Sequence, residues 1–161
     1  MKVAVCPGSF DPVTLGHVDI MNRASKLFDR VIVLVSVNPT KKASFTAQER
    51  VEMIKTVTKH IDNIVVDVYE GLLADYLKET GASAIVKGLR AVSDFEYEFQ
   101  MALANKKLYN EAETVFLTTS AENMYLSSSV VKQIASFGGD ISHFVPGEIL
   151  ETIKNRLIKG E

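Results

Sequence analysis

Short, nearly continuous apolar runs alternate along the chain with longer segments in which apolar residues recur at helical spacing. A continuous apolar run bounded by turn residues is typical of a strand that is buried on both faces of a sheet. On this basis the predicted strands span residues 2–6, 31–37, 63–69, 84–86 and 114–117. The predicted helices span residues 16–28, 46 onward, 72–79, 93–109, 127–138 and 146–159.

Polar residues at two predicted helix starts support these boundaries. Thr46 and Glu49, and again Ser93 and Glu96, have the spacing of a capping box, in which each side chain satisfies a free backbone N–H. Gly81 follows the third predicted helix, where a glycine readily ends a helix because it tolerates the left-handed conformation.

The order of the elements predicts the fold. Strands alternate with helices across short connections, which is typical of a parallel sheet with right-handed crossovers. The chain has no low-complexity segment and no linker, so one domain over residues 1–161 is expected. The predicted class is therefore α/β: a Rossmann-like, doubly wound, parallel five-stranded sheet with helices on both faces.

Basic and small polar residues follow most of the predicted strands. In parallel sheets, ligands bind outside the carboxyl ends of the strands, near the point where the strand order reverses. The residues that fall at this edge are Gly8, Ser9, His17, Lys41, Lys42, Lys87, Gly88, Arg90, Ser127, Ser128 and Ser129. Because helix starts also present free N–H groups there, the edge is suited to binding several phosphates.

Composition and missing motifs restrict the remaining function classes. The net charge of −2 leaves no basic field for nucleic acid, and no apolar run approaches the ~20 residues of a membrane span. Cys6 is the only cysteine and is expected to be buried, so a cytoplasmic location is predicted. Neither GxxxxGK[ST] nor GxGxxG is present, which argues against a P-loop NTPase and a dinucleotide oxidoreductase.

Four blocks of sequence resemble a known family. Thr14-Leu15-Gly16-His17 resembles the T/HxGH signature of the nucleotidylyltransferase superfamily, and residues 127–132 resemble its serine-rich second signature. Residues 87–98, with 38–42 and 45–50, are similar to those of bacterial phosphopantetheine adenylyltransferases. The resemblance implies that the adenylyl group of ATP is transferred to 4'-phosphopantetheine, giving dephospho-coenzyme A and pyrophosphate. It also implies in-line attack on the α-phosphorus without a covalent enzyme intermediate.

The resemblance assigns residues to each substrate. The implied catalytic residues are His17, Lys41, Arg90 and Ser128. The implied contacts to ATP are Ser9, Phe10, His17, Gly88, Leu89, Arg90, Glu98, Asn123, Met124, Tyr125, Leu126, Ser127, Ser128 and Ser129. The implied contacts to phosphopantetheine are Ser9, Lys41, Leu73 and Lys87. Asp11 is interpreted as a turn residue and no acidic cluster suggests a protein metal site, so Mg²⁺ is expected to accompany ATP.

Ordinary structural roles remain open for several of these residues. His17 lies on the inward stripe of its predicted helix and could be a core histidine. Thr14, Ser128 and Ser129 stand where a helix cap is also expected. Lys41 and Lys42 could form a solvated pair without contact to a substrate.

Two sites depart from the family pattern. Lys87 stands where the family more often has arginine, so the charge is kept but bidentate binding of a phosphate is lost. Asn123-Met124-Tyr125 replaces an aromatic-Ser-aromatic run, so packing on the adenine side is expected to differ.

Two other functions stay open: adenylyl transfer to another acceptor, such as a pyridine mononucleotide or a phosphorylated polyol, and a nucleotide sensor without catalysis.

The predicted helix over residues 94–109 carries two apolar stripes about half a turn apart. One consists of Phe95, Phe99, Ala102 and Leu103, and the other of Tyr97, Met101, Ala104 and Leu108. A helix that covers a sheet needs only one such stripe, so the second predicts burial against another copy of the chain. The family resemblance implies a hexamer.

Overall fold

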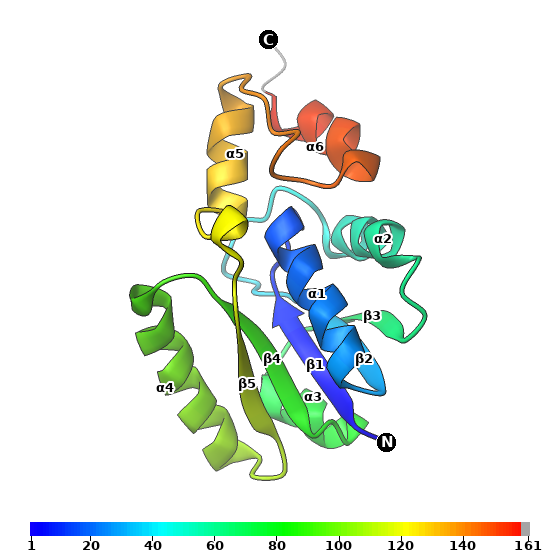
Figure 1. Cartoon of the computed structure of the whole chain (residues 1–161), viewed down its shortest axis with the longest axis vertical. Coiled ribbons are helices and arrows are strands. Elements are labelled where there is room, and N and C mark those ends of the chain that lie inside the picture. The colour runs from blue at the N-terminus through cyan, green and yellow to red at the C-terminus, as the bar shows by residue number, and fades with distance from the viewer. Residues whose placement is uncertain (159–161) are drawn as a thin grey trace.

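The structure is a computed structural model that describes residues 1–158, apart from the side chains of Val92 and Ser93. Within this range one sheet has the strand order β3-β2-β1-β4-β5 (Figure 1). Its strands are β1 (Val3–Gly8), β2 (Arg30–Ser36), β3 (Ile64–Tyr69), β4 (Ala84–Leu89) and β5 (Glu113–Thr118). All neighbouring strands are parallel, which confirms the predicted doubly wound α/β sheet.

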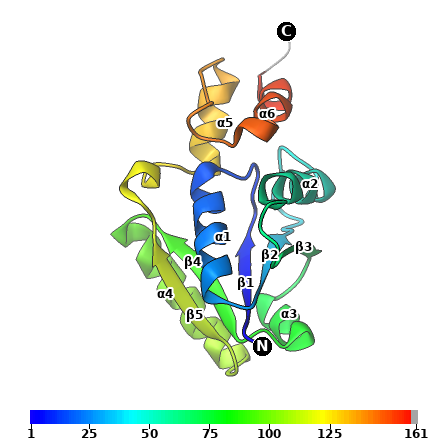
Figure 2. The same cartoon turned by 45° about the vertical axis from the view of Figure 1, so that its right-hand side comes forward.

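Helices cover both faces of this sheet. They are α1 (Leu15–Leu27), α2 (Ala47–Thr58), α3 (Leu73–Thr80), α4 (Val92–Leu108), α5 (Ser128–Ser136) and α6 (Leu150–Leu157). Helices α1 and α2 pack on one face, and α3 and α4 on the other. Figure 2 shows α5 and α6 beyond the carboxyl ends of the strands, as does Figure 1. None of the described helices combines the length and apolarity needed to cross a membrane.

Alternate residues of the central strands enter two cores. Ala4 and Cys6 of β1 belong to the core on the α1 face, whereas Val5 packs on the α3 face. In β2, Val33 likewise belongs to the core on the α1 face and Leu34 to the core on the α3 face. Since both faces of the sheet are covered, both sets of side chains are apolar, which explains the continuous apolar runs in the sequence. The predicted burial of Cys6 is confirmed.

Several boundaries differ from the prediction; β1, for example, continues to Gly8, two residues past its predicted end. β4 continues to Leu89, three residues past the predicted end, because Lys87, Gly88 and Leu89 pair with β5. The C-terminal segment begins with a 3₁₀ turn at Gly147–Ile149, and α6 follows from Leu150 rather than from Pro146. The predicted end at residue 159 lies outside the described residues.

The helix caps were predicted in part. The Thr46 side chain accepts the N–H of Glu49 at 3.1 Å, which confirms this cap, and the Glu49 carboxylate also pairs with Arg156. The predicted box at Ser93 is wrong, because α4 begins at Val92 with Ala91 as its N-cap residue. The Ser93 side chain lies outside the described part of the chain.

Helix α4 is exposed on more than one side. Phe95 stacks on Phe99 and meets Phe116 of β5 edge-on with ring centroids 5.9 Å apart. Even so, none of its described side chains is buried, and Tyr97 and Leu103 are 63% and 57% exposed. The expectation that one stripe would be buried against the sheet is therefore met only in part.

Candidate active site

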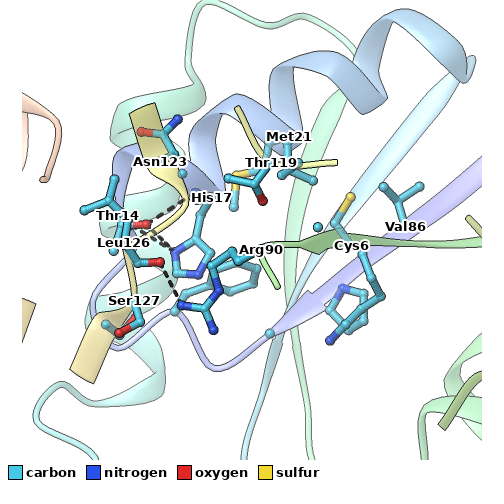
Figure 3. Close-up of a pocket in the computed structure, with 18 of the residues that line it drawn as sticks. Cys6, Thr14, His17, Met21, Val86, Arg90, Thr119, Asn123, Leu126 and Ser127 are labelled. Carbon is cyan, nitrogen blue, oxygen red and sulfur yellow. Dashed lines mark hydrogen bonds between the residues drawn. The ribbon is translucent and has the colours of Figure 1, made fainter. Parts of the chain in front are cut away.

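A first cavity, of about 250 Å³, lies at the carboxyl ends of β1 and β4 (Figure 3). The strand order reverses between these two strands, since their outer neighbours β2 and β5 extend the sheet in opposite directions. Parallel sheets bind ligands at such a switch point. The cavity wall comes from the β1–α1 loop, the start of α1, the end of β4 and the segment before α5.

The start of α1 holds the imidazole of His17 in one orientation. Thr14 is the N-cap residue, and its hydroxyl accepts the N–H of His17 at 3.3 Å. In return, the Thr14 N–H donates to Nδ1 of His17 at 2.9 Å (Figure 3). This is a capping box in which histidine takes the place of the usual Glu or Gln. Because Nδ1 accepts a hydrogen bond, the neutral ring carries its proton on Nε2.

His17 is neutral at physiological pH. Burial and the neighbouring charges of Arg90 and Lys87 lower its pKa to about 4, from an ordinary value of 6.5. The ring also meets Phe10 edge-on, with centroids 5.0 Å apart. A neutral imidazole with a proton on Nε2 supplies a fixed N–H donor to the cavity, and it does not act as a general acid at pH 7.

Gly8 and Phe10 shape the floor of the β1–α1 loop. Phe10 has a φ of 48°, in the left-handed region, which turns its ring back over the strand end. A Cβ atom at Gly8 would lie 2.8 Å from this ring. A side chain at Gly8 would therefore displace Phe10, and with it the ring that packs against the histidine.

Arg90 and Lys87 bring two positive charges to the cavity wall. Arg90 pairs with Asp94 through Nε at 3.2 Å and donates from Nη1 to the carbonyl of Leu126 at 2.8 Å. Lys87 pairs with Glu98 at 3.3 Å. Each cation is thus oriented by a carboxylate of α4, and both stand beside the neutral imidazole. An anionic ligand in this cavity would meet two cations and one N–H donor.

The serines before α5 have structural partners. Ser127 is the N-cap residue, and its hydroxyl accepts the N–H of Val130 at 3.1 Å. The Ser128 hydroxyl donates to the carbonyl of Pro12 at 2.7 Å, which ties α5 to the β1–α1 loop. The cap considered for Ser128 and Ser129 therefore lies one residue earlier, at Ser127. The free N–H groups of the first turn remain at the cavity edge, where they suit an anion.

A second cavity, of about 460 Å³, adjoins the first. It lies among the β1 end, the start of α3 and helix α4, and apolar side chains such as Leu73 and Met101 form much of its wall. Lys87 and Glu98 line both cavities. Their ion pair therefore stands at the boundary between a polar cavity and a more apolar one.

The structure gathers most of the predicted site residues around these two cavities. Those on the first cavity are Phe10, His17, Lys87, Gly88, Arg90, Glu98, Asn123, Leu126, Ser127 and Ser128. Ser9 and Leu73 line the second cavity. The predicted residues that line neither are Lys41, Leu89, Met124, Tyr125 and Ser129. Lys41 lies exposed on the segment that follows β2.

Comparison with known proteins identifies the family. The family described as cytidylyltransferase-like matches residues 5–134. The chain is 57% identical over 160 residues to the phosphopantetheine adenylyltransferase of Caldanaerobacter subterraneus subsp. tengcongensis, which covers 99% of this chain and 100% of that protein. It is 60% identical over 156 residues to the enzyme of the same name from Clostridium botulinum strain Alaska E43, covering 97% and 98%. The chain belongs to the phosphopantetheine adenylyltransferase family.

A solved structure of another protein has the same fold as this member of the phosphopantetheine adenylyltransferase family. A protein of Vibrio parahaemolyticus assigned as a nicotinate-nucleotide adenylyltransferase superposes with a TM-score of 0.70 at 18% identity. The match covers 95% of this chain and 99% of that one. At this identity the likeness concerns the fold alone.

Two buried charged residues of this family member were not predicted to support the site. Asp11, interpreted as a turn residue, has a buried carboxylate that accepts hydrogen bonds from another segment. Arg50 is also buried, and it donates to the carbonyl of Ser9 at 2.9 Å. Arg50 shares the inward stripe of α2 with Ile54 and Val57, and a charge at an inward position is a detectable signal. Asp11 gives no such signal, because aspartate is common in turns.

Proposed function

We propose that the chain transfers the adenylyl group of ATP to 4'-phosphopantetheine, giving dephospho-coenzyme A and pyrophosphate. One observation carries the proposal: two adjoining cavities, one polar and one more apolar, share the Lys87–Glu98 ion pair at the switch point of the sheet. Two substrates that must meet at a phosphate fit this arrangement. Full-length similarity to phosphopantetheine adenylyltransferases supports this choice of acceptor.

ATP occupies the first cavity in this proposal. Arg90 holds the β- and γ-phosphates, and the start of α5 adds free N–H groups. His17 donates from Nε2 to an oxygen of the α-phosphate. This hydrogen bond strengthens as negative charge builds on the transferring group, so it stabilises the transition state more than the bound substrate.

The phosphate of phosphopantetheine is the nucleophile. Lys87 and Ser9 hold it at the boundary of the two cavities, and an oxygen of this phosphate forms a bond to the α-phosphorus. The bond from the α-phosphorus to the oxygen bridging to the β-phosphorus breaks, and pyrophosphate leaves with that electron pair. Lys41 reaches in to bridge the incoming phosphate and the transferring group. Positioning and charge stabilisation account for the catalysis.

No covalent intermediate on the protein is part of this mechanism. Cys6 is the one thiol in the chain, and burial raises its pKa to about 12, so it stays protonated. Among the described residues, no group of three or more His, Cys, Asp or Glu side chains could hold a metal ion. Mg²⁺ bound together with ATP would be held mainly by phosphate oxygens and water, and it would neutralise charge on the phosphates.

The pantetheine arm lies in the second cavity, along Leu73 and the apolar face of α4. The same helix supports a proposal of self-association, since Phe99 and Leu103 of its first stripe are 46% and 57% exposed and line neither cavity. A stripe of this kind fits a second copy of the chain, and we propose the hexamer that the family resemblance implies. A cytoplasmic location stays a prediction from the sequence.

The decisive experiment compares acceptors. Pyrophosphate release from ATP is measured with 4'-phosphopantetheine and, in parallel, with nicotinamide mononucleotide. Release with the first acceptor alone is expected. Release with the mononucleotide alone would assign the chain to another acceptor class, and ATP binding without turnover on any acceptor would indicate a nucleotide sensor.

A further inference from the structure

Asp11 joins three segments around the site, and the mechanism above gives it no role. Its carboxylate accepts the backbone N–H groups of Ser44 and Phe45, both at 2.9 Å. It also pairs with the ammonium group of Lys132 on α5 at 2.6 Å. Only 6% of Asp11 is exposed, so these charge-assisted hydrogen bonds are strong and their loss would leave a buried carboxylate unsatisfied.

The segment that Asp11 holds is the one that carries Lys41. At its first end, Val37 donates to the carbonyl of Tyr69 at 3.1 Å, and Lys41 donates its own N–H to the carbonyl of Asn38 at 3.1 Å. At its other end, the hydrogen bonds from the N–H groups of Ser44 and Phe45 to Asp11 tie it to the β1–α1 loop. Lys41 therefore lies between two anchored ends of the segment, one at Val37 and one at Ser44. The anchor at Ser44 is made by Asp11, and it connects the segment to the phosphate side of the site.

Two cations support this connection from opposite sides. Lys132 lies on α5, whose start forms the edge of the first cavity. Arg156 donates to the carbonyl of Ser44 at 2.9 Å and forms two hydrogen bonds with Glu49. The peptide at Ser44 is thus held at its N–H by Asp11 and at its carbonyl by α6. This arrangement fixes the end of a short segment whose side chains are exposed from residue 38 to residue 43.

We propose that Asp11 is a positioning residue for adenylyl transfer, which holds the 38–45 segment so that Lys41 reaches the transferring phosphoryl group. Lys132 in turn holds the carboxylate in place. The inference rests on the role given to Lys41 in the proposed function. A displacement of about 1 Å at a reacting group costs up to about 100-fold in rate, so loosening this segment lowers kcat. ATP affinity stays unchanged, because Arg90 and His17 are left intact.

A double-mutant cycle tests whether Asp11 acts through Lys41. Asp11→Asn keeps the size of the side chain but cannot accept all three hydrogen bonds. In the wild-type background it is expected to lower kcat by about 10- to 100-fold, and in the Lys41→Ala background by less than about 3-fold. The dissociation constant of ATP, measured by calorimetry, is expected to stay the same. Equal losses in both backgrounds, or full activity of Lys41→Ala, would overturn the inference.

Hydrogen exchange gives a second readout that needs no turnover. Asp11→Asn is expected to speed amide exchange in residues 38–45 while β1 and β2 keep their protection. Glu52→Gln, which weakens the exposed 3.5 Å pair with Lys55, is the matched control and should change neither. Faster exchange throughout the sheet, or none in residues 38–45, contradicts the inference.

Variants of Lys132 complete the test. Lys132→Met removes the charge that holds Asp11 and should show part of the kcat loss expected of Asp11→Asn. Lys132→Arg keeps the charge and should retain most of the wild-type kcat. Equal activity of Lys132→Met and the wild type would contradict the role of the pair. Failure of the proposed function gives a different result from failure of this inference. The wild-type chain would then release no pyrophosphate with phosphopantetheine, and the hydrogen-exchange experiment would still decide whether Asp11 holds the segment.

Discussion

The imidazole of His17 caps α1 and, in the proposed function, donates to the α-phosphate, and His17→Asn would remove only the second role. In asparagine, Oδ1 stands as many bonds from Cα as Nδ1 does in histidine. It can therefore accept the Thr14 N–H that Nδ1 now accepts at 2.9 Å. Asparagine has no atom at the place of Nε2, so the donor proposed for the α-phosphate is lost. His17→Ala removes both the cap and the donor.

The expected magnitudes differ for the two roles. Removal of one preorganised donor to a developing negative charge lowers kcat by about 10²–10³, which corresponds to about 3–4 kcal/mol. Loss of one capping hydrogen bond lowers the free energy of unfolding by about 1 kcal/mol. For a chain of this size, that loss lowers Tm by about 2–4 °C. The imidazole is also part of the packing against Phe10, so alanine loses slightly more.

The assay measures kcat by pyrophosphate release at saturating ATP and phosphopantetheine, and Tm by circular dichroism. Both variants are expected to be slow to a similar degree, and only His17→Ala is expected to melt earlier. Turnover of His17→Asn within about 3-fold of the wild type would refute the donor role, since the expected loss is at least about 10². If both variants melt at the same lowered temperature, the capping role of the ring is refuted instead.

Three further predictions follow from the charges and surfaces of the structure. Because the folded chain lowers the pKa of His17 to about 4, from about 6.5, the unfolded state binds more protons between these values. The free energy of unfolding should therefore fall by up to about 3 kcal/mol as pH drops from 6.5 to 4, and urea titrations should show a smaller fall in His17→Asn. Lys87→Arg should lower the KM for phosphopantetheine by about 2- to 10-fold with little change in kcat, because guanidinium binds phosphate bidentately; steady-state kinetics that show a raised KM would contradict this. Phe99→Glu with Leu103→Glu should convert an oligomer into monomers in light scattering, and a wild-type chain that is already monomeric at micromolar concentration would remove the basis for this prediction.

Much of the fold could be predicted because burial on both faces of the sheet leaves a plain mark on the sequence. β4, which was predicted three residues too short, shows the limit of this sequence signal. Lys87-Gly88-Leu89 has the composition of a loop, yet its backbone pairs with β5. Pairing of this kind depends on the neighbouring strand, and local residue preference cannot report it.

The candidate site was predictable where one local motif sets its geometry. Residues 14–17 form a helix start, so their spacing alone places the imidazole at the cavity. Asp11 acts instead through residues more than thirty positions away, which no local pattern records. Lys41 was predicted to face the substrates, but it lies exposed outside both cavities, since its position depends on that same distant contact.

The cap at Thr14 has a consequence for how such a site can be built. In many enzymes a catalytic histidine is oriented by a second side chain, usually a carboxylate, that must be placed from elsewhere in the fold. Here the orienting partner is a peptide N–H three residues back in the same helix start, so the tautomer and the direction of the ring come from four consecutive residues. A designer who needs an N–H donor in a fixed direction beside a phosphate could graft these residues onto the start of another helix, without a carboxylate that would repel the ligand.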